Sequence, residues 1–439
     1  MHTQFSKTFL TPFAFPLLIV MLSSSSAAAQ QPTPSPAPIN PTQQKEPLCK
    51  KFREEKNIDN IILCAQQVND RLEWHGIKPT FGGIVPGSGF GGGVAYSFLK
   101  RTEKDDGDTS VVWQKNFDAD AKITHRKYWE LAASLNVTRT QSRFEPGFGD
   151  LEMNFYGQVR GMPRLDFYGI GPETSRAAKA KYHYREAVIG ADIAAPVSRW
   201  LDVGGAVEGI WPELTRITDP TAVSVNDIFT DLTAPGLAGD PAYVRVTGYV
   251  GLHLPGQPES RRLAYDFFYN IYHDATGSGF SFRRFDADLK HKFRLGEKSE
   301  IRFRGRLSAA DTSRGQRVPF YLQETLGGSN IRNEDTLRGF DDYRFRDQAH
   351  ALFQTDFMTQ LYGPLKLIVF YDTGKVGPSF SRLDEGRLRH TFGTGIVIVP
   401  RQLDKIMFRF YAAFGSGEGS HVFFGPGDSI MGGSNKLLR

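Results

Sequence analysis

Cysteine, clustered charge and long apolar runs are all scarce in this chain of 439 residues. Only two cysteines are present, and no GxSxG, HExxH or paired zinc-ligand spacing occurs, so the sequence predicts no metal, no cofactor and no catalytic residue. The formal net charge is +5, but no lysine and arginine block marks nucleic-acid binding. The mean hydropathy is −0.36, and past the N-terminus no run reaches the roughly 18 apolar residues of a spanning helix.

The N-terminus is the exception to this lack of apolar runs. Lys7 precedes TFLTPFAFPLLIVML and then SSSSAAAQ. A basic start, a short apolar run and small residues predict a signal peptide over residues 1–29, with an uncleaved anchor helix as the alternative. The proline-rich stretch at 30–47 is typical of an extended linker. The mature protein is therefore expected to be exported.

Residues 48–75 carry apolar side chains at helical spacing and predict a short periplasmic helical segment. Two interpretations are open: an inert helix, or a plug or partner-docking element. Cys49 and Cys64 lie in this segment. A continuous helix would hold them roughly 22 Å apart, at about 1.5 Å per residue, so a disulfide between them requires a helical hairpin. Their pairing is left open.

From Gly76 onward apolar residues alternate with polar ones. FDADLKHKFRL (285–295) and EIRFRGRL (300–307) each place apolar side chains on one face and charged side chains on the other. These segments are about ten to fifteen residues long, against about five or six for ordinary strands. A soluble sandwich would need shorter strands and opposed apolar faces. Residues 76–439 are therefore predicted to form an all-β domain, a transmembrane antiparallel β-barrel with a wet, charged lumen.

About sixteen strands are expected, an even number as bacterial barrels require. With both ends of the barrel in the periplasm, the long connections at 162–180, 212–240, 311–347 and 374–387 all face outside. The stretch RTEKDDGDTS is long for a periplasmic turn. The predicted strand centres are Phe81, Val94, Phe117, Ala133, Phe155, Val188, Val203, Val246, Phe267, Leu289, Phe303, Phe353, Val369, Ile396, Phe410 and Phe423.

The connection between the eleventh and twelfth strands contains TLRGFDDYRFRD, with three arginines and three aspartates. Such a loop could be solvated outside the cell. Downstream, however, Asp372 belongs to the aromatic strand VFYDTGKV. A carboxylate on the lumen face would draw an arginine inward, because Arg–carboxylate pairs are bidentate and stronger where water is partly excluded.

Several short motifs in this region carry a family resemblance. ETLGGSN (324–330), LRGF (337–340), FYDTG (370–374) and HTFGTGIVIVP (390–400), in this order, resemble the C-terminal signature of the BamA/TamA-type bacterial surface antigen family. FYGIGPETS (167–175) resembles a further stretch common in that family. The resemblance covers roughly Gly76 to Gly425.

The resemblance implies a sixteen-stranded outer-membrane barrel whose sixth external loop folds into the lumen. Arg338 at the tip would contact Asp372, Gly339 would give the turn an unusual backbone, and Phe340 would pack against the inner wall. Gly374 closes the strand motif. The loop would begin at Gly327 and Gly328.

The family's working edge is the seam between the first and last strands, because weak pairing there lets a client strand add. In this chain the seam is expected near Gly82, Gly92, Val422 and Phe424. Members that assemble barrels also carry periplasmic repeat domains of about 75 residues each, and residues 30–75 offer no room for one. The family usually ends on an aromatic residue, whereas this chain continues past HVFFG to SNKLLR.

These observations predict a non-enzymatic protein of the bacterial outer membrane that handles polypeptides or lipids. The expected partners are outer-membrane lipid, including lipopolysaccharide, and client polypeptides or a separate periplasmic protein. No nucleic-acid partner is expected. Two alternatives are a passive pore for small solutes and a barrel-embedded hydrolase using His273, Asp274 and His390.

Overall fold

A computed structural model of the chain describes residues 75–105, 110–141, 150–217, 219, 221–253, 263–399, 406 and 408–426. The chain divides into two compact units, Met1–Pro47 and Leu48–Arg439, and the first lies wholly outside the described residues. The predicted signal peptide, linker, helical segment (apart from His75) and the two cysteines also lie outside them. All of the described residues belong to the second unit.

The prediction of an all-β chain with sixteen strands is confirmed. One antiparallel sheet of 16 strands holds β1 to β11 and β14 to β18, each paired with its neighbour along the chain. Every predicted strand centre falls within one of these strands. Their bounds are β1 Ile77–Phe81, β2 Gly91–Asp105, β3 Ser110–Thr124, β4 Trp129–Gln141, β5 Leu151–Phe167, β6 Ala180–Ser198, β7 Leu201–Thr215, β8 Tyr243–His253, β9 Leu263–Asp274, β10 Phe282–Leu295, β11 Ser299–Asp311, β14 Ala349–Tyr362, β15 Leu365–Gly377, β16 Arg389–Ile398, β17 Phe408–Gly415 and β18 Gly419–Pro426.

The strands differ from the expected lengths at both extremes. β6 has 19 residues and β1 only five. The stretch RTEKDDGDTS is mostly strand rather than turn, because β2 and β3 pair as far as Asp105 and Ser110. A pairing this long leaves only residues 106–109 for the connection between the two strands. The connection is therefore as short as a periplasmic turn is expected to be.

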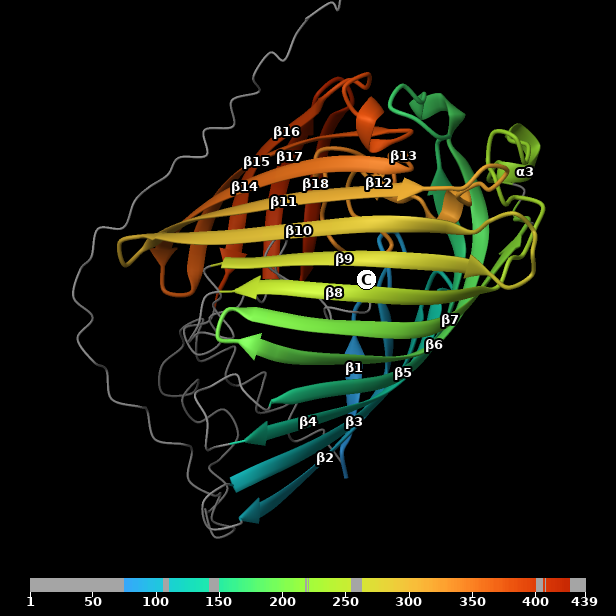
Figure 1. Cartoon of the computed structure of the whole chain (residues 1–439). Helices are drawn as coiled ribbons and strands as arrows, with labels where there is room; N and C mark the ends of the chain where they lie inside the picture. The colour runs from blue at the N-terminus through green and yellow to red at the C-terminus, as the bar shows by residue number, and fades with distance from the viewer. Residues whose placement is uncertain are drawn as a thin grey trace, which may run out of the picture. The chain divides into compact units, whose positions relative to one another are not determined.

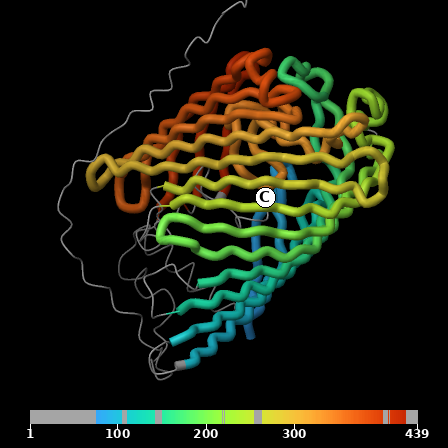
Figure 2. Tube along the Cα trace, viewed as in Figure 1, coloured from blue at the N-terminus to red at the C-terminus, as the bar shows by residue number. Residues whose placement is uncertain are grey.

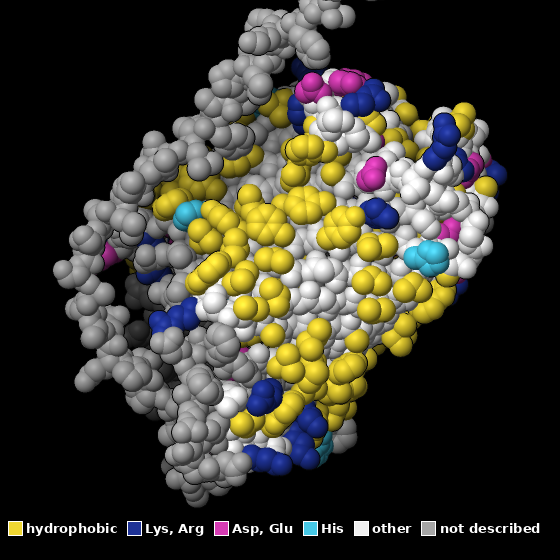
Figure 3. Space-filling model, in the orientation of Figure 1, with side chains coloured by type: hydrophobic (Ala, Val, Ile, Leu, Met, Phe, Trp, Pro, Cys, Tyr) yellow, Lys and Arg dark blue, Asp and Glu magenta, His cyan; other side chains and the backbone are white. Residues whose placement is uncertain are grey.

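Several strands alternate between a buried and an exposed face, and β8 does so most regularly. In β8 the side chains of Tyr243, Arg245 and Thr247 are buried, whereas those of Val244 and Val246 between them are exposed. This is the reverse of a soluble core, since polar groups face inward and apolar ones outward. Figure 3 shows hydrophobic side chains gathered over the middle of the outer face, with charged ones toward its margins. A face of this kind suits contact with lipid.

The sheet curves around an interior occupied by its own chain (Figures 1 and 2). Residues 312–348, the connection between β11 and β14, are called the luminal segment here. Its side chains and carbonyls contact Arg160 on β5, Arg304 on β11 and Arg409 on β17. Strands so far apart in one sheet meet the same segment only if the sheet wraps around it.

Short elements fill the connections. They are the helix α3 (Val225–Ile228), the 3₁₀ turns η1 (Arg176–Ala178), η2 (Phe320–Leu322) and η3 (Phe380–Arg382), and a small sheet of β12 (Glu324–Leu326) and β13 (Phe345–Asp347). Among the described residues no helix is long and apolar enough to cross a membrane.

One end of the interior is covered by connections from several strands. A single apolar cluster joins Ile84 of the β1–β2 connection, Tyr128 of the β3–β4 turn, Val225 of the β7–β8 connection, and Phe320 and Tyr343 of the luminal segment. Segments far apart in the sequence therefore pack together over this end of the lumen.

Candidate functional site: the luminal segment and its ion pairs

The luminal segment folds back on itself through two glycines. Gly327 and Gly328 have φ values of 113° and 51°, in the region that favours glycine. A Cβ on Gly327 would lie 2.5 Å from the Cβ of Arg344, so a side chain there would clash. The reversal lets β12 pair with β13, and the LRGF stretch belongs to the loop that connects these two strands.

Arg338 lies at the centre of the site and is 2% exposed. Its Nε donates to Oδ2 of Asp372 on β15 at 2.9 Å, and its Nη2 donates to Oδ1 of Asp356 on β14 at 2.8 Å. The guanidinium carbon lies 3.7 Å from the ring centre of Phe370. The structure thus brings Arg338 and Asp372 together and adds a second carboxylate that the sequence motifs do not predict.

Asp356 also accepts from Nη2 of Arg302 on β11 at 2.8 Å. One buried carboxylate therefore joins the luminal segment to the wall and β11 to β14. Alternation along the sequence could have placed Asp356 on the polar face of β14, but its position opposite Arg302 follows only from the register.

A second set of ion pairs holds the turn just before LRGF. Asp335 accepts from both terminal nitrogens of Arg409 on β17, at 2.6 and 3.1 Å, and from the hydroxyl of Tyr411 at 2.9 Å. Glu334 lies 3.1 Å from Arg304 and 3.1 Å from Arg306, both on β11. The segment is therefore fixed to walls on two sides of the lumen.

Gly339 requires a correction. The expectation that it gives the turn an unusual backbone is wrong, because its φ is not in the left-handed region. The residue is constrained by proximity instead: an added Cβ would lie 2.5 Å from the amide nitrogen of Gly415 on β17. Phe340 packs beside Leu352 and Val376 of the wall in an apolar cluster. Gly374 lies on β15, where a Cβ would come within 2.8 Å of the carbonyl oxygen of Ala351.

The outer part of the luminal segment contacts neighbouring connections. Asp341 accepts from Arg176 at 2.8 and 3.0 Å, and Arg344 lies 2.7 Å from Glu418 in the β17–β18 turn. Arg176 is half exposed, so this pair is screened by water far more than the Arg338 cluster.

Buried titratable groups of the segment are shifted by their surroundings. Burial lowers the pKa of the Arg338 guanidinium, but the charges of Asp356 and Asp372 outweigh it and hold that pKa well above its ordinary value. Burial raises the pKa of Asp342 to about 7, and the nearby carboxylate of Asp335 adds to the effect. For Glu324, burial opposes ionisation, yet three arginines, Arg332 foremost, lower its pKa.

The two end strands of the sheet form the predicted seam region. Within the described part of the chain, β1 pairs only with β2 and β18 only with β17. Gly92 on β2 lies opposite Phe81 on β1. Gly82 follows Phe81, and a Cβ added to Gly82 would meet no atom within 4 Å. Val422 and Phe424 on β18 are strongly exposed. Each end strand thus has one edge without a ladder partner among these residues.

The residues considered for a hydrolase are not brought together. His273 is exposed on the outer face of β9, whereas Asp274 is buried and accepts from Thr276 and Ser278 in the following turn. His390 contacts Tyr371 and Thr373 on the neighbouring strand. In the described ranges no group of three or more His, Cys, Asp or Glu side chains could hold a metal ion.

Comparisons with known proteins give structural likeness at low identity. No family model and no curated protein matches the sequence. BamA from Haemophilus ducreyi lacking POTRA domains 1–3 is 12% identical, with a TM-score of 0.47, over 82% of this chain and 77% of that one. CdiB from Acinetobacter baumannii is 12% identical, with a TM-score of 0.41, over 75% and 59%. OccAB4 from Acinetobacter baumannii is 9% identical, with a TM-score of 0.31, over 80% and 95%.

Proposed function

We propose that this chain is an integral protein of the bacterial outer membrane, a barrel closed by its own luminal segment. It handles polypeptides or lipids at the membrane rather than passing solutes steadily. The observation that carries this proposal is the buried ion-pair cluster of Arg338 with Asp356 and Asp372, which fixes the segment inside the sheet. The outward apolar face supports a membrane setting.

The handling of polypeptides or lipids draws on two further features. The motifs around LRGF and FYDTG resemble those of the surface antigen family. The end strands β1 and β18 each present an unpaired edge among the described residues, and such an edge is a template for strand addition. A client strand could extend the sheet there while the luminal segment keeps the barrel shut.

Planar-bilayer conductance tests the closed barrel against the passive pore. The wild-type protein should stay mostly closed, because the segment is fixed to several strands by buried charge pairs. A variant with Arg338→Ala and Asp335→Ala should open more often, since both sets of ion pairs are weakened. Large, steady openings of the wild-type protein would favour the pore and contradict the proposal.

A crosslink tests the part played by the end strands. In a chain with Cys49 and Cys64 replaced by serine, Phe81→Cys and Val422→Cys would place one exposed thiol on each end strand. If these edges meet and open in function, oxidation should join them and reduce the activity assayed, and reduction should restore it. Full crosslinking with full activity would remove the end strands from the mechanism.

A further inference from the structure

Arg346 is a buried cation that has no carboxylate partner in the described part of the chain. It is 3% exposed, yet no carboxylate of the described residues lies within ion-pair distance of its guanidinium. Its partners are the carbonyl oxygen of Phe320 and, at 3.4 Å, the hydroxyl of Tyr182, with the ring of Phe320 beside it. Its Nε has no hydrogen-bond partner. A buried, uncompensated charge is costly, so it calls for a counter-ion.

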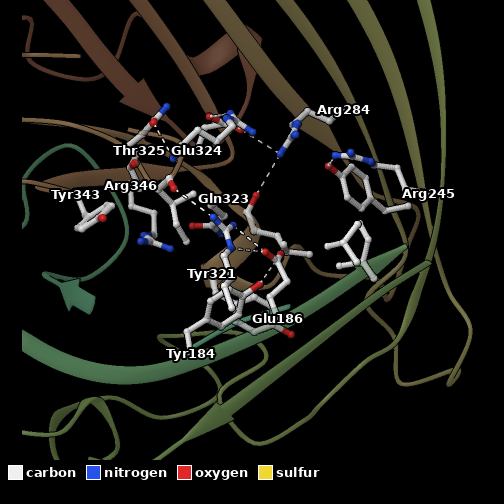
Figure 4. A pocket seen from close by; sticks show the side chains of 18 of the residues that line it. Tyr184, Glu186, Arg245, Arg284, Tyr321, Gln323, Glu324, Thr325, Tyr343 and Arg346 are labelled. Carbon is white, nitrogen blue, oxygen red and sulfur yellow. Dashed lines mark hydrogen bonds and ion pairs between the residues drawn. The ribbon is translucent and has the colours of Figure 1, made fainter. Parts of the chain in front are cut away.

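Other unpartnered polar atoms belong to side chains around the same cavity. The hydroxyls of Tyr321 and Tyr343 are buried without a hydrogen-bond partner, and so is Oε1 of Gln323. These three residues and Arg346 line one luminal cavity of about 130 Å³, seen in Figure 4. Buried polar groups are nearly always satisfied, so three donors and one acceptor around one space are suited to a polar ligand that bonds to all of them.

The charge of the lining favours an anion. Five arginines and three glutamates line this cavity. Four of the arginines pair with carboxylates: Arg160, Arg245, Arg284 and Arg332. Only the charge of Arg346 is left unpaired in this lining. A volume of this kind also exceeds the roughly 10–15 Å³ that one water requires, so it has room for a small oxyanion.

A wider basic vestibule shares one residue with this cavity. It has a volume of about 710 Å³ and is lined by Arg126, Lys127, Arg164, Lys179, Lys181 and Arg216 against Asp166, Asp219 and Asp342. Tyr343 lines both spaces. This tyrosine has a φ of 59°, a strained conformation for a residue other than glycine, which persists only where the surroundings impose it.

We propose that the cavity beside Arg346 binds a phosphate group, free or carried by a larger molecule that fills the vestibule. Arg346 and the two phenols would donate to the phosphate oxygens, as charged and neutral donors do in oxyanion sites. The unpartnered oxygen of Gln323 would accept from the O–H that phosphate retains near neutral pH. Sulfate has no such proton, so the site should prefer phosphate.

The test uses the full chain purified in detergent, with inorganic phosphate as the probe and ionic strength held constant. The midpoint of heat modifiability should rise with phosphate and reach a plateau, as expected for a ligand that binds only the folded state. Sulfate should raise it less. Arg346→Gln should weaken phosphate binding by about tenfold or more, and Tyr343→Phe by a few-fold, the loss expected for one charged and one neutral hydrogen bond.

Tyr243→Phe is the matched control. Its hydroxyl is also buried and unpartnered, but Tyr243 does not line the cavity. This variant should bind phosphate like the wild type. Vesicles with and without diphosphorylated lipid A separate the two sources: a rise that requires lipid A identifies a lipid headgroup, and a rise with inorganic phosphate alone identifies the free ion. No rise with either, an equal effect of sulfate, or equal binding by Arg346→Gln and Tyr243→Phe would overturn the proposal.

Discussion

Arg338 and Arg346 belong to the same short stretch of the luminal segment and are both almost fully buried, yet their surroundings differ completely. Arg338 contacts two carboxylates and the face of Phe370. Arg346 contacts a carbonyl oxygen, a phenol and aromatic rings. Burial of a charge therefore does not tell its role. The role follows from the number of counter-charges. Arg338, with two carboxylates, fixes the segment to the wall, whereas Arg346 leaves a charge for a ligand to neutralise.

The largest effect is expected at Arg338. Arg338→Ala leaves Asp372 buried without its cation, and breaking a buried pair in this way costs roughly 3–5 kcal/mol. The midpoint of heat modifiability should fall, and protease sensitivity near Asp341 and Asp342 should rise. A midpoint equal to that of the wild type would mean that the segment is solvated.

The second set of ion pairs should matter less. Arg409→Gln removes the charged partner of Asp335, but Tyr411 still donates to that carboxylate. A loss of about 1.5–3 kcal/mol in the free energy of unfolding is expected, the range for hydrogen bonds to charged groups. Arg176→Ala is the control, because its exposed pair with Asp341 should contribute only about 0–1 kcal/mol.

The pH dependence of the segment should trace to Asp342. Its folded pKa of about 7 lies above the roughly 3.9 of an unfolded aspartate, so the folded state holds the proton more tightly. This contribution to stability is full below about pH 4 and is lost as pH rises through about 7. In Asp342→Asn the midpoint of heat modifiability should vary less with pH between about 4 and 7. The substitution should also stabilise the protein at pH 8 by about 1–2 kcal/mol, a figure reduced for partial exposure. An unchanged pH profile would contradict it.

The smallest effect is expected at Arg346. Without phosphate, Arg346→Gln should cause no loss in the free energy of unfolding, because it removes a buried charge that no carboxylate of the described residues compensates. The free energies of unfolding of Arg346→Gln and Arg338→Gln can be compared by equilibrium unfolding in phosphate-free buffer. If the two variants lose the same stability, the distinction between the arginines is lost.

The strands of this protein were predictable from the sequence because their signal is local. Alternation places valine outside in β8 and arginine inside in both β8 and β11, without knowledge of any partner strand.

The partners inside the lumen were only partly predictable. Asp372 stands out in an apolar strand, but Asp356 pairs with both Arg302 and Arg338, which only the register and the path of the segment bring together. Gly339 shows the same limit: its need for space depends on the backbone of β17, far along the chain. Nothing local in YRFRD shows that Arg346 lacks a counter-charge among the residues that the structure describes.

A double-mutant cycle on Arg338 and Asp372 tests the central claim most directly, that the luminal segment is held inside the barrel by this buried pair. The midpoints of heat modifiability would be measured for the wild type, Arg338→Ala, Asp372→Ala and the double variant. Because the two changes break one interaction, the double variant should be no less stable than the worse single variant. Additive losses, or no loss in any variant, would mean that the two side chains do not interact and would contradict the claim.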